Sequence, residues 1–170
     1  MTISAAFDVQ GGGTHSWNLV TDASTLTAGD IIVIAAYNVS YKTSGNTYID
    51  NKVMGAISSS IGTVIDVTFN STGTTIESLP AGARQYTLGG NYTDGWTLKN
   101  GSNYLSIKED KKIQETTTES TWSISINSNE ATMTQSAYPD HTLQYNPNSG
   151  NGRFTAYYSN QKPIRIYRYE

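Results

Sequence analysis

The sequence predicts an all-β domain, a β-trefoil-like barrel of about twelve short strands in three repeats of four strands. The main observation is a four-strand order that occurs twice, at residues 96–99, 104–108, 113–117 and 122–126, and again at 131–135, 141–145, 154–158 and 164–167. The second is a composition with only 15% charged residues and much Ser, Thr, Asn and Gly, which suits strand faces and turns. A closed barrel would leave no edge strands. The alternative is a β-sandwich.

The first half of the chain predicts an enlarged first repeat, residues 30–88. A first strand begins at Trp17, and Asp22 caps one helical turn over residues 22–26. The apolar run 31–37 predicts a strand that is buried on both faces. The polar stretch 38–52 predicts a long loop. Further strands are expected at residues 53–57, 64–69, 74–77 and 85–88, with a turn at 70–73.

The second half predicts the other two repeats, residues 96–126 and 131–167. Trp122, Ile124 and Ile126 alternate with serines, so one face of this strand is expected in the core and the other in water. Trp17, Trp96 and Trp122 are predicted core residues. No window shows helical periodicity.

Length and composition bound the remaining possibilities. The 170 residues suffice for one domain with a core, here residues 17–170, after a flexible lead over residues 1–16 that contains three consecutive glycines. The absence of cysteine excludes disulfides and thiolate zinc sites. A net charge of −3 provides no field that attracts nucleic acid. No apolar stretch is long enough to span a bilayer.

Six segments resemble a β-rich domain that is common in exported and surface proteins of Bacteroidetes. They are WNLVTD at 17–22, LTAGDIIVI at 26–34, TWSI at 121–124, LQYN at 143–146, RFTAY at 153–157 and QKPIRIY at 161–167. The resemblance extends over nearly all of the chain after residue 16. It implies an accessory module of a surface protein or secreted enzyme, without a catalytic role and without an established ligand.

The inventory of reactive side chains predicts no enzyme. The chain has two histidines and no Gly-x-Ser-x-Gly nucleophile elbow. Glu109 and Asp110 lie among lysines, as expected for a solvated hairpin tip rather than a glycosidase pair. The sequence contains no Asp-x-Asp-x-Asp loop, which is the pattern that would indicate a calcium site. We therefore expect no catalytic residue, no metal site and no cofactor.

Carbohydrate binding is the leading functional hypothesis. Sugars are bound by aromatic rings against their C–H faces and by polar side chains at their hydroxyls. Twelve tyrosines against three phenylalanines favour aromatic side chains with a polar end. The residues expected at turns or on outward strand faces are Tyr92, Tyr138, Asp140, His141, Asn146, Arg153 and Tyr157.

These observations together predict a non-enzymatic binding or adhesion module of a bacterial exported or cell-surface protein. The expected partner is a glycan or another surface ligand, and the lead 1–16 could mediate self-association. We expect no signal peptide in this chain, and neither a membrane span nor nucleic-acid binding. The alternative is a structural subunit of a surface layer, a filament or a phage particle.

Overall fold

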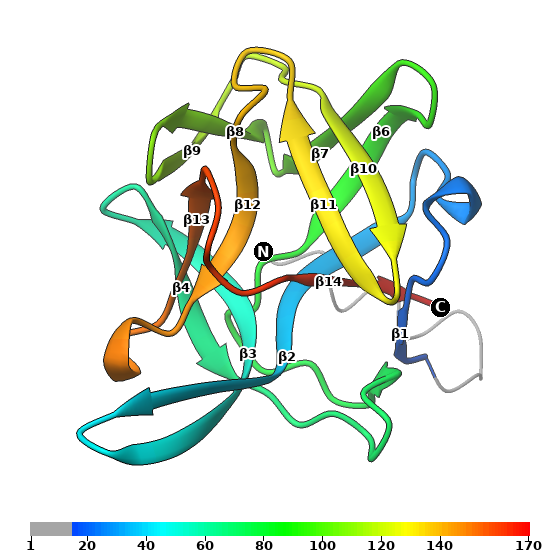
Figure 1. Cartoon of the computed structure of the whole chain (residues 1–170). Coiled ribbons are helices and arrows are strands. Elements are labelled where there is room, and N and C mark those ends of the chain that lie inside the picture. Colours follow the sequence, from blue (N-terminus) through cyan, green and yellow to red (C-terminus); the bar gives the residue numbers. More distant parts are fainter. Residues whose placement is uncertain (1–14) are drawn as a thin grey trace.

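The computed structural model describes residues 15–170, which form a 14-stranded antiparallel sheet without any α-helix (Figure 1). The strands are β1 (Trp17–Leu19), β2 (Ile31–Thr43), β3 (Asn46–Ser58), β4 (Ile61–Asp66), β5 (Thr75–Ile76), β6 (Tyr86–Asn91), β7 (Gly95–Asn100), β8 (Asn103–Glu109), β9 (Lys112–Thr116), β10 (Trp122–Asn127), β11 (Glu130–Gln135), β12 (Thr142–Asn146), β13 (Arg153–Tyr157) and β14 (Arg165–Tyr169). Two short 3₁₀ helices, η2 (Ala23–Thr25) and η3 (Asn148–Gly150), join them. The prediction of an all-β domain is confirmed. The described residues include no helix that is long and apolar enough to cross a membrane.

The main path of paired strands is β11-β10-β7-β6-β2-β3-β4-β13-β12, with β1, β5, β8, β9 and β14 attached beside it. The sheet does not close into a continuous barrel. Strand β14 pairs with β2 over Ile32–Ala35, and one isolated bridge, Ala131 to Ile164, connects β11 to the residue that precedes β14. The curled sheet therefore encloses a core without a complete ring of ladders.

The core has two parts, which lie on opposite faces of β2. Ile32, Ile34 and Ala36 face the larger cluster with Trp96 and Trp122. Val33 and Ala35 alternate with them and face a smaller cluster. The continuous apolar run of β2 is thus explained by burial on both faces, as the sequence predicted. All three tryptophans are buried, also as predicted.

The predicted loop over residues 38–52 is wrong. These residues form the distal parts of β2 and β3, which pair with each other from Val39↔Asp50 to Thr43↔Asn46. The pattern predicted a loop because the polar side chains here face solvent on an extended hairpin. A two-residue turn with positive φ at Ser44 and Gly45 joins the strands, and this is the geometry that two-residue hairpins favour.

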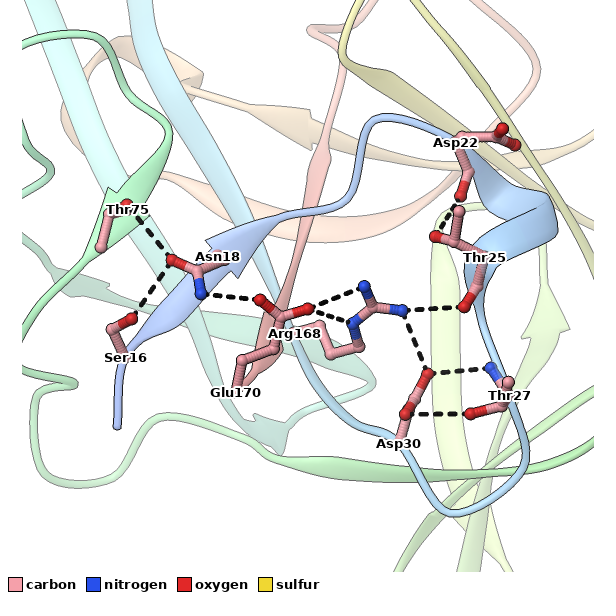
Figure 2. A network of polar contacts seen from close by, with 9 residues as sticks. All are labelled: Ser16, Asn18, Asp22, Thr25, Thr27, Asp30, Thr75, Arg168 and Glu170. Atoms are coloured by element: carbon pink, nitrogen blue, oxygen red, sulfur yellow. Dashed lines mark hydrogen bonds and ion pairs between the residues drawn. The ribbon is translucent and has the colours of Figure 1, made fainter. Parts of the chain in front are cut away.

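The two ends of the described chain are held together by paired strands and a polar network (Figure 2). Arg168 donates hydrogen bonds to the carbonyl of Thr25 at 2.9 Å and to Glu170 through Nε at 2.9 Å, and it pairs with Asp30 at 3.4 Å. The side chain of Asn18 donates to the other carboxylate oxygen of Glu170 at 2.8 Å. Hydrogen bonds from Asn18 and Arg168 lower the pKa of Glu170.

The predicted flexible lead, residues 1–16, lies almost wholly outside the described residues. Its last residue, Ser16, exchanges two backbone hydrogen bonds with Glu170, at 3.0 and 2.9 Å. The ring of His15 stacks on Tyr169 with centroids 5.0 Å apart. These contacts extend the pairing of β1 with β14 by one residue at each strand end.

Candidate functional site

The turn between β6 and β7, at the end of a hairpin that is green in Figure 1, has a fixed geometry. The side-chain oxygen of Asn91 accepts hydrogen bonds from the backbone of Thr93 at 2.9 Å and of Asp94 at 2.8 Å, and its amide donates to the Asp94 carboxylate at 3.0 Å. Gly90 has φ +84°, and a Cβ atom there would lie 2.2 Å from the carbonyl oxygen of Gly95. The turn therefore holds Tyr92 and Asp94 in fixed positions.

Tyr92 lies at this turn with 57% of its surface exposed. Its ring borders a hollow of about 360 Å³ between the turn and the strands β10 and β11. The polar side chains that line this hollow are Thr93, Asp94, Thr121, Ser123, Thr134, Gln135 and Ser136. Ser123 and Thr134 are cross-strand partners whose hydroxyl oxygens are 2.5 Å apart. The hollow thus combines an exposed aromatic ring with hydroxyl, amide and carboxylate groups.

A second hollow, of about 390 Å³, lies on the other side of the same turn, over the outer faces of β6 and β7. Its floor lacks a side chain at Gly89, where a Cβ atom would lie 2.5 Å from the hydroxyl of Thr97. Tyr104 lines it and donates a hydrogen bond to Glu119 at 3.2 Å. Lys99 lies 5.5 Å from the centroid of the Tyr104 ring.

Asp94, Gly95 and Thr121 line both hollows. The two hollows are therefore neighbouring recesses on either side of Asp94, with Tyr92 in one and Tyr104 in the other. Carboxylates and hydroxyls accept hydrogen bonds from sugar hydroxyls, and phenol rings pack against sugar C–H groups. The arrangement can hold a polyhydroxylated ligand that spans the turn.

Tyr138 and His141, two other predicted site residues, come together in a separate cluster. The phenol of Tyr138 donates a hydrogen bond to the carbonyl of Lys108 at 2.6 Å. His141 is buried, with Nε2 3.2 Å from Asp110 and its ring centroid 4.0 Å from that of Tyr158. These contacts connect the end of β8 and the β8–β9 turn to the segment before β12.

Asn146, Arg153 and Tyr157 lie on one face of the β12–β13 hairpin. The amide of Asn146 donates to the phenol oxygen of Tyr157 at 3.1 Å, and Asn146 is the cross-strand partner of Arg153. Tyr157 is buried. None of the three lines either hollow beside Asp94. Asp140 is exposed and follows Pro139, which lines the first hollow.

Of the residues predicted for the site, the structure therefore places only Tyr92 in the wall of a hollow at the β6–β7 turn. The sequence argument missed Thr121, Ser123, Thr134 and Gln135. The alternation at residues 122–126 already placed Ser123 outward. Thr134 lies beside Ser123 because β10 pairs with β11 in one particular register. A local sequence pattern does not specify that register, so it could not predict that the two side chains share a site.

A larger hollow, of about 440 Å³, lies between residues 66–70 and 77–80. It contains none of the predicted site residues and no exposed aromatic side chain. Its Asp66 is paired with Lys52. Among residues 15–170, no group of three or more His, Asp or Glu side chains is arranged to hold a metal ion.

Comparison of the chain with protein-family models, with curated proteins and with solved structures yields no match. The assignment of a function therefore rests on the geometry of the hollows and on the composition of their walls.

Proposed function

We propose that the two hollows beside Asp94 bind a carbohydrate and that the chain is a non-enzymatic binding module. The observation that supports this most directly is the exposed ring of Tyr92 at the edge of a hollow with polar walls. A half-exposed phenol ring can cover one face of a sugar and still present its hydroxyl to water. Thr121, Ser123 and Asp94 then supply hydrogen-bonding groups for the sugar hydroxyls.

We also infer a trefoil-like arrangement of three four-strand units, which are β2-β3-β4-β6, β7-β8-β9-β10 and β11-β12-β13-β14. The pairing of the strands supports it, because the middle two strands form a hairpin in every unit. The first and last strands of each unit meet through Ile31↔Thr87, Trp96↔Trp122 and Ala131↔Ile164. Successive units are joined by β6–β7, β10–β11 and β14–β2. On this inference the hollows lie where the second unit begins and ends.

The resemblance to an accessory domain of Bacteroidetes supports a place of action outside the cell or at its surface. Polysaccharides and glycoproteins are the ligands expected at that location. A shallow polar recess can accommodate such large ligands better than a closed pocket can. The alternative, a structural subunit, is favoured by a different part of the molecule, the long β2–β3 hairpin, and does not involve the hollows.

The test is a glycan array with the whole chain, followed by calorimetric titration of the best glycan with two tyrosine variants. Tyr92→Ala should weaken binding by about tenfold or more, which corresponds to about 1.4 kcal/mol, because the stacking ring is lost. Tyr158→Ala is the matched control, since Tyr158 is 61% exposed but lines neither hollow. We expect it to bind as the parent chain does.

Two outcomes would contradict the proposal in different ways. A chain that binds no glycan on the array would overturn the function. Glycan binding that is lost in Tyr158→Ala and unchanged in Tyr92→Ala would leave the function standing and move the site to the β12–β13 side of the molecule.

A further inference from the structure

The β2–β3 hairpin extends away from the body of the domain, at the lower left of Figure 1. Near its base, β14 pairs with β2 over Ile32–Ala35 and β4 pairs with β3 over Lys52–Ser58. From Val39↔Asp50 to the tip, the two strands pair with each other and with no other described strand. Both edges of the distal hairpin are therefore without a paired strand among the described residues.

The turn of the hairpin determines which backbone groups of β3 point to its open edge. Thr43 and Asn46 flank a two-residue turn whose central residues have φ +51° and +78°, and such flanking residues form a hydrogen-bonded pair. Hydrogen-bonded pairs alternate along an antiparallel ladder. Asn46, Tyr48 and Asp50 therefore bond to β2, and the N–H and C=O groups of Thr47 and Ile49 point outward.

A second observation leads to the same assignment of outward-pointing residues along β3. On the outer side of β3, the carbonyl oxygen of Asn51 accepts a hydrogen bond from the N–H of Val67 at 3.2 Å. Residue 51 thus points its backbone groups to the side opposite β2. In a regular strand residues 49 and 47 must do the same.

The side chains on this edge are exposed and uncharged. Asn46, Thr47, Tyr48 and Ile49 are all exposed, with Tyr48 at 43% and Ile49 at 59%. Edge strands that stay single usually carry charges, prolines or bulges that prevent pairing. The distal part of β3 has none of these before Asp50, whereas the β2 edge carries Lys42.

The hairpin is also held in one orientation. The phenol of Tyr145 donates a hydrogen bond to the buried Asp50 at 2.5 Å. Tyr41 and Tyr48 stack across the strands with centroids 5.5 Å apart and ring planes at 20°. A preorganised edge loses little conformational entropy when it pairs.

We propose that the β3 edge, residues 46–49, pairs antiparallel with the same edge of a second copy of this chain, about a two-fold axis at Tyr48. In this register Thr47 lies opposite Ile49 of the second copy, so that the outward groups of both residues exchange hydrogen bonds. A register centred on Ile49 would instead need the carbonyl of Asn51, which already accepts from Val67. The available backbone groups therefore select Tyr48 as the centre.

This register is also favourable for the side chains. Tyr48 would lie opposite itself in a non-hydrogen-bonded pair, the kind in which side chains are closest. The existing stack of Tyr41 on Tyr48 would continue into the second copy as a ladder of four rings, and aromatic cross-strand pairs stabilise sheets. The contact area is small, so we expect a weak dimer that depends on concentration. The inference is independent of glycan binding.

The first test uses the absence of cysteine from the chain. Opposite residues in a non-hydrogen-bonded pair have Cα atoms about 4.5 Å apart, within the range of a disulfide. Tyr48→Cys should therefore form a covalent dimer rapidly under mild oxidation. Ser40→Cys is the matched control, because Ser40 is exposed on the other strand of the same hairpin, and it should cross-link at least about tenfold more slowly.

The second test introduces a charged side chain at position 48, on the proposed two-fold axis. Tyr48→Lys and Tyr48→Glu should each be monomeric by light scattering, since like charges would lie directly opposite each other. An equimolar mixture should form a heterodimer. Circular dichroism melts of both variants show that they fold, which the exposure of Tyr48 leads us to expect.

Three results would overturn the proposal. The first is a parent chain that stays monomeric at millimolar concentration while Tyr48→Cys cross-links no faster than Ser40→Cys. The second is a Tyr48→Lys variant that associates as strongly as the parent. The third is a mass well above two chains, which would indicate an open assembly rather than a closed pair.

Discussion

Many of the tyrosines that suggested a binding face instead fill the interior. Tyr86, Tyr145 and Tyr167 are fully buried. Tyr145 donates to Asp50, and Tyr167 donates to the carbonyl of Gly73 at 2.6 Å. Burial raises the pKa of Tyr167 to about 12 and also raises the pKa of Tyr145, so both phenols stay protonated as donors at neutral pH. An excess of tyrosine therefore indicates polar ends inside the core as much as an exposed surface.

Two buried tryptophans, one in β7 and one in β10, differ in one hydrogen bond. Trp96 and Trp122 are cross-strand partners and both are buried. The indole N–H of Trp122 donates to the carbonyl of Leu105 at 2.9 Å. The indole N–H of Trp96 has no partner among the described residues. The two side chains are therefore both buried, but within residues 15–170 only the indole of Trp122 has its N–H group hydrogen-bonded.

We predict that Trp122→Phe lowers the free energy of unfolding by about 1 to 2 kcal/mol more than Trp96→Phe does. Both changes remove similar volume, but only the first leaves the Leu105 carbonyl without its buried donor. Urea denaturation followed by circular dichroism measures the difference. Equal losses in the two variants would show that the Trp122 hydrogen bond contributes nothing net.

At the scale of elements, the β6–β7 hairpin depends on one close backbone approach. Gly90 has positive φ and faces the carbonyl of Gly95 with no room for a side chain. Gly101, in the turn between β7 and β8, also has positive φ but has open space around it. The two glycines therefore separate the cost of a left-handed backbone from the cost of a clash.

We predict that Gly90→Ala destabilises the chain by more than about 2 kcal/mol, while Gly101→Ala costs about 1 kcal/mol. The first change must also displace the turn that carries Tyr92 and Asp94, so glycan binding should fall with it. Thermal melts of both variants check the stability. Equal costs would mean that the hairpin opens without penalty to accept the Cβ atom.

The polar network at the chain ends acts on the whole molecule, because it joins β1, the segment after η2 and β14 (Figure 2). We predict that Arg168→Ala lowers the free energy of unfolding by about 2 kcal/mol, since it removes charge-assisted hydrogen bonds to three groups. Lys112→Ala is the control. It breaks an exposed pair with Glu109 and should lower the free energy of unfolding far less than Arg168→Ala does, because solvent screens such pairs. Urea titration distinguishes them, and an Arg168→Ala loss no larger than the control would show that the network is not stabilising.

This network also makes the free energy of unfolding depend on pH in the acidic range. The pKa of Glu170 is lower in the folded chain than in the unfolded chain, so its contribution is present above the unfolded value. That contribution is lost as the pH falls through the lowered folded value. Arg168→Ala should therefore reduce the slope of stability against pH in this acidic range.

The sequence by itself determined the all-β class, the burial of β2 on both faces and the core positions of the tryptophans. These follow from side-chain alternation and apolar runs, which are local properties of the chain. Tertiary structure decided that residues 38–52 form a hairpin, that His141 and Tyr157 are buried, and that Tyr92 borders a hollow with Ser123 and Thr134. Those outcomes depend on which strands pair and in what register, and pairing between residues far apart in the chain leaves no mark in a local pattern.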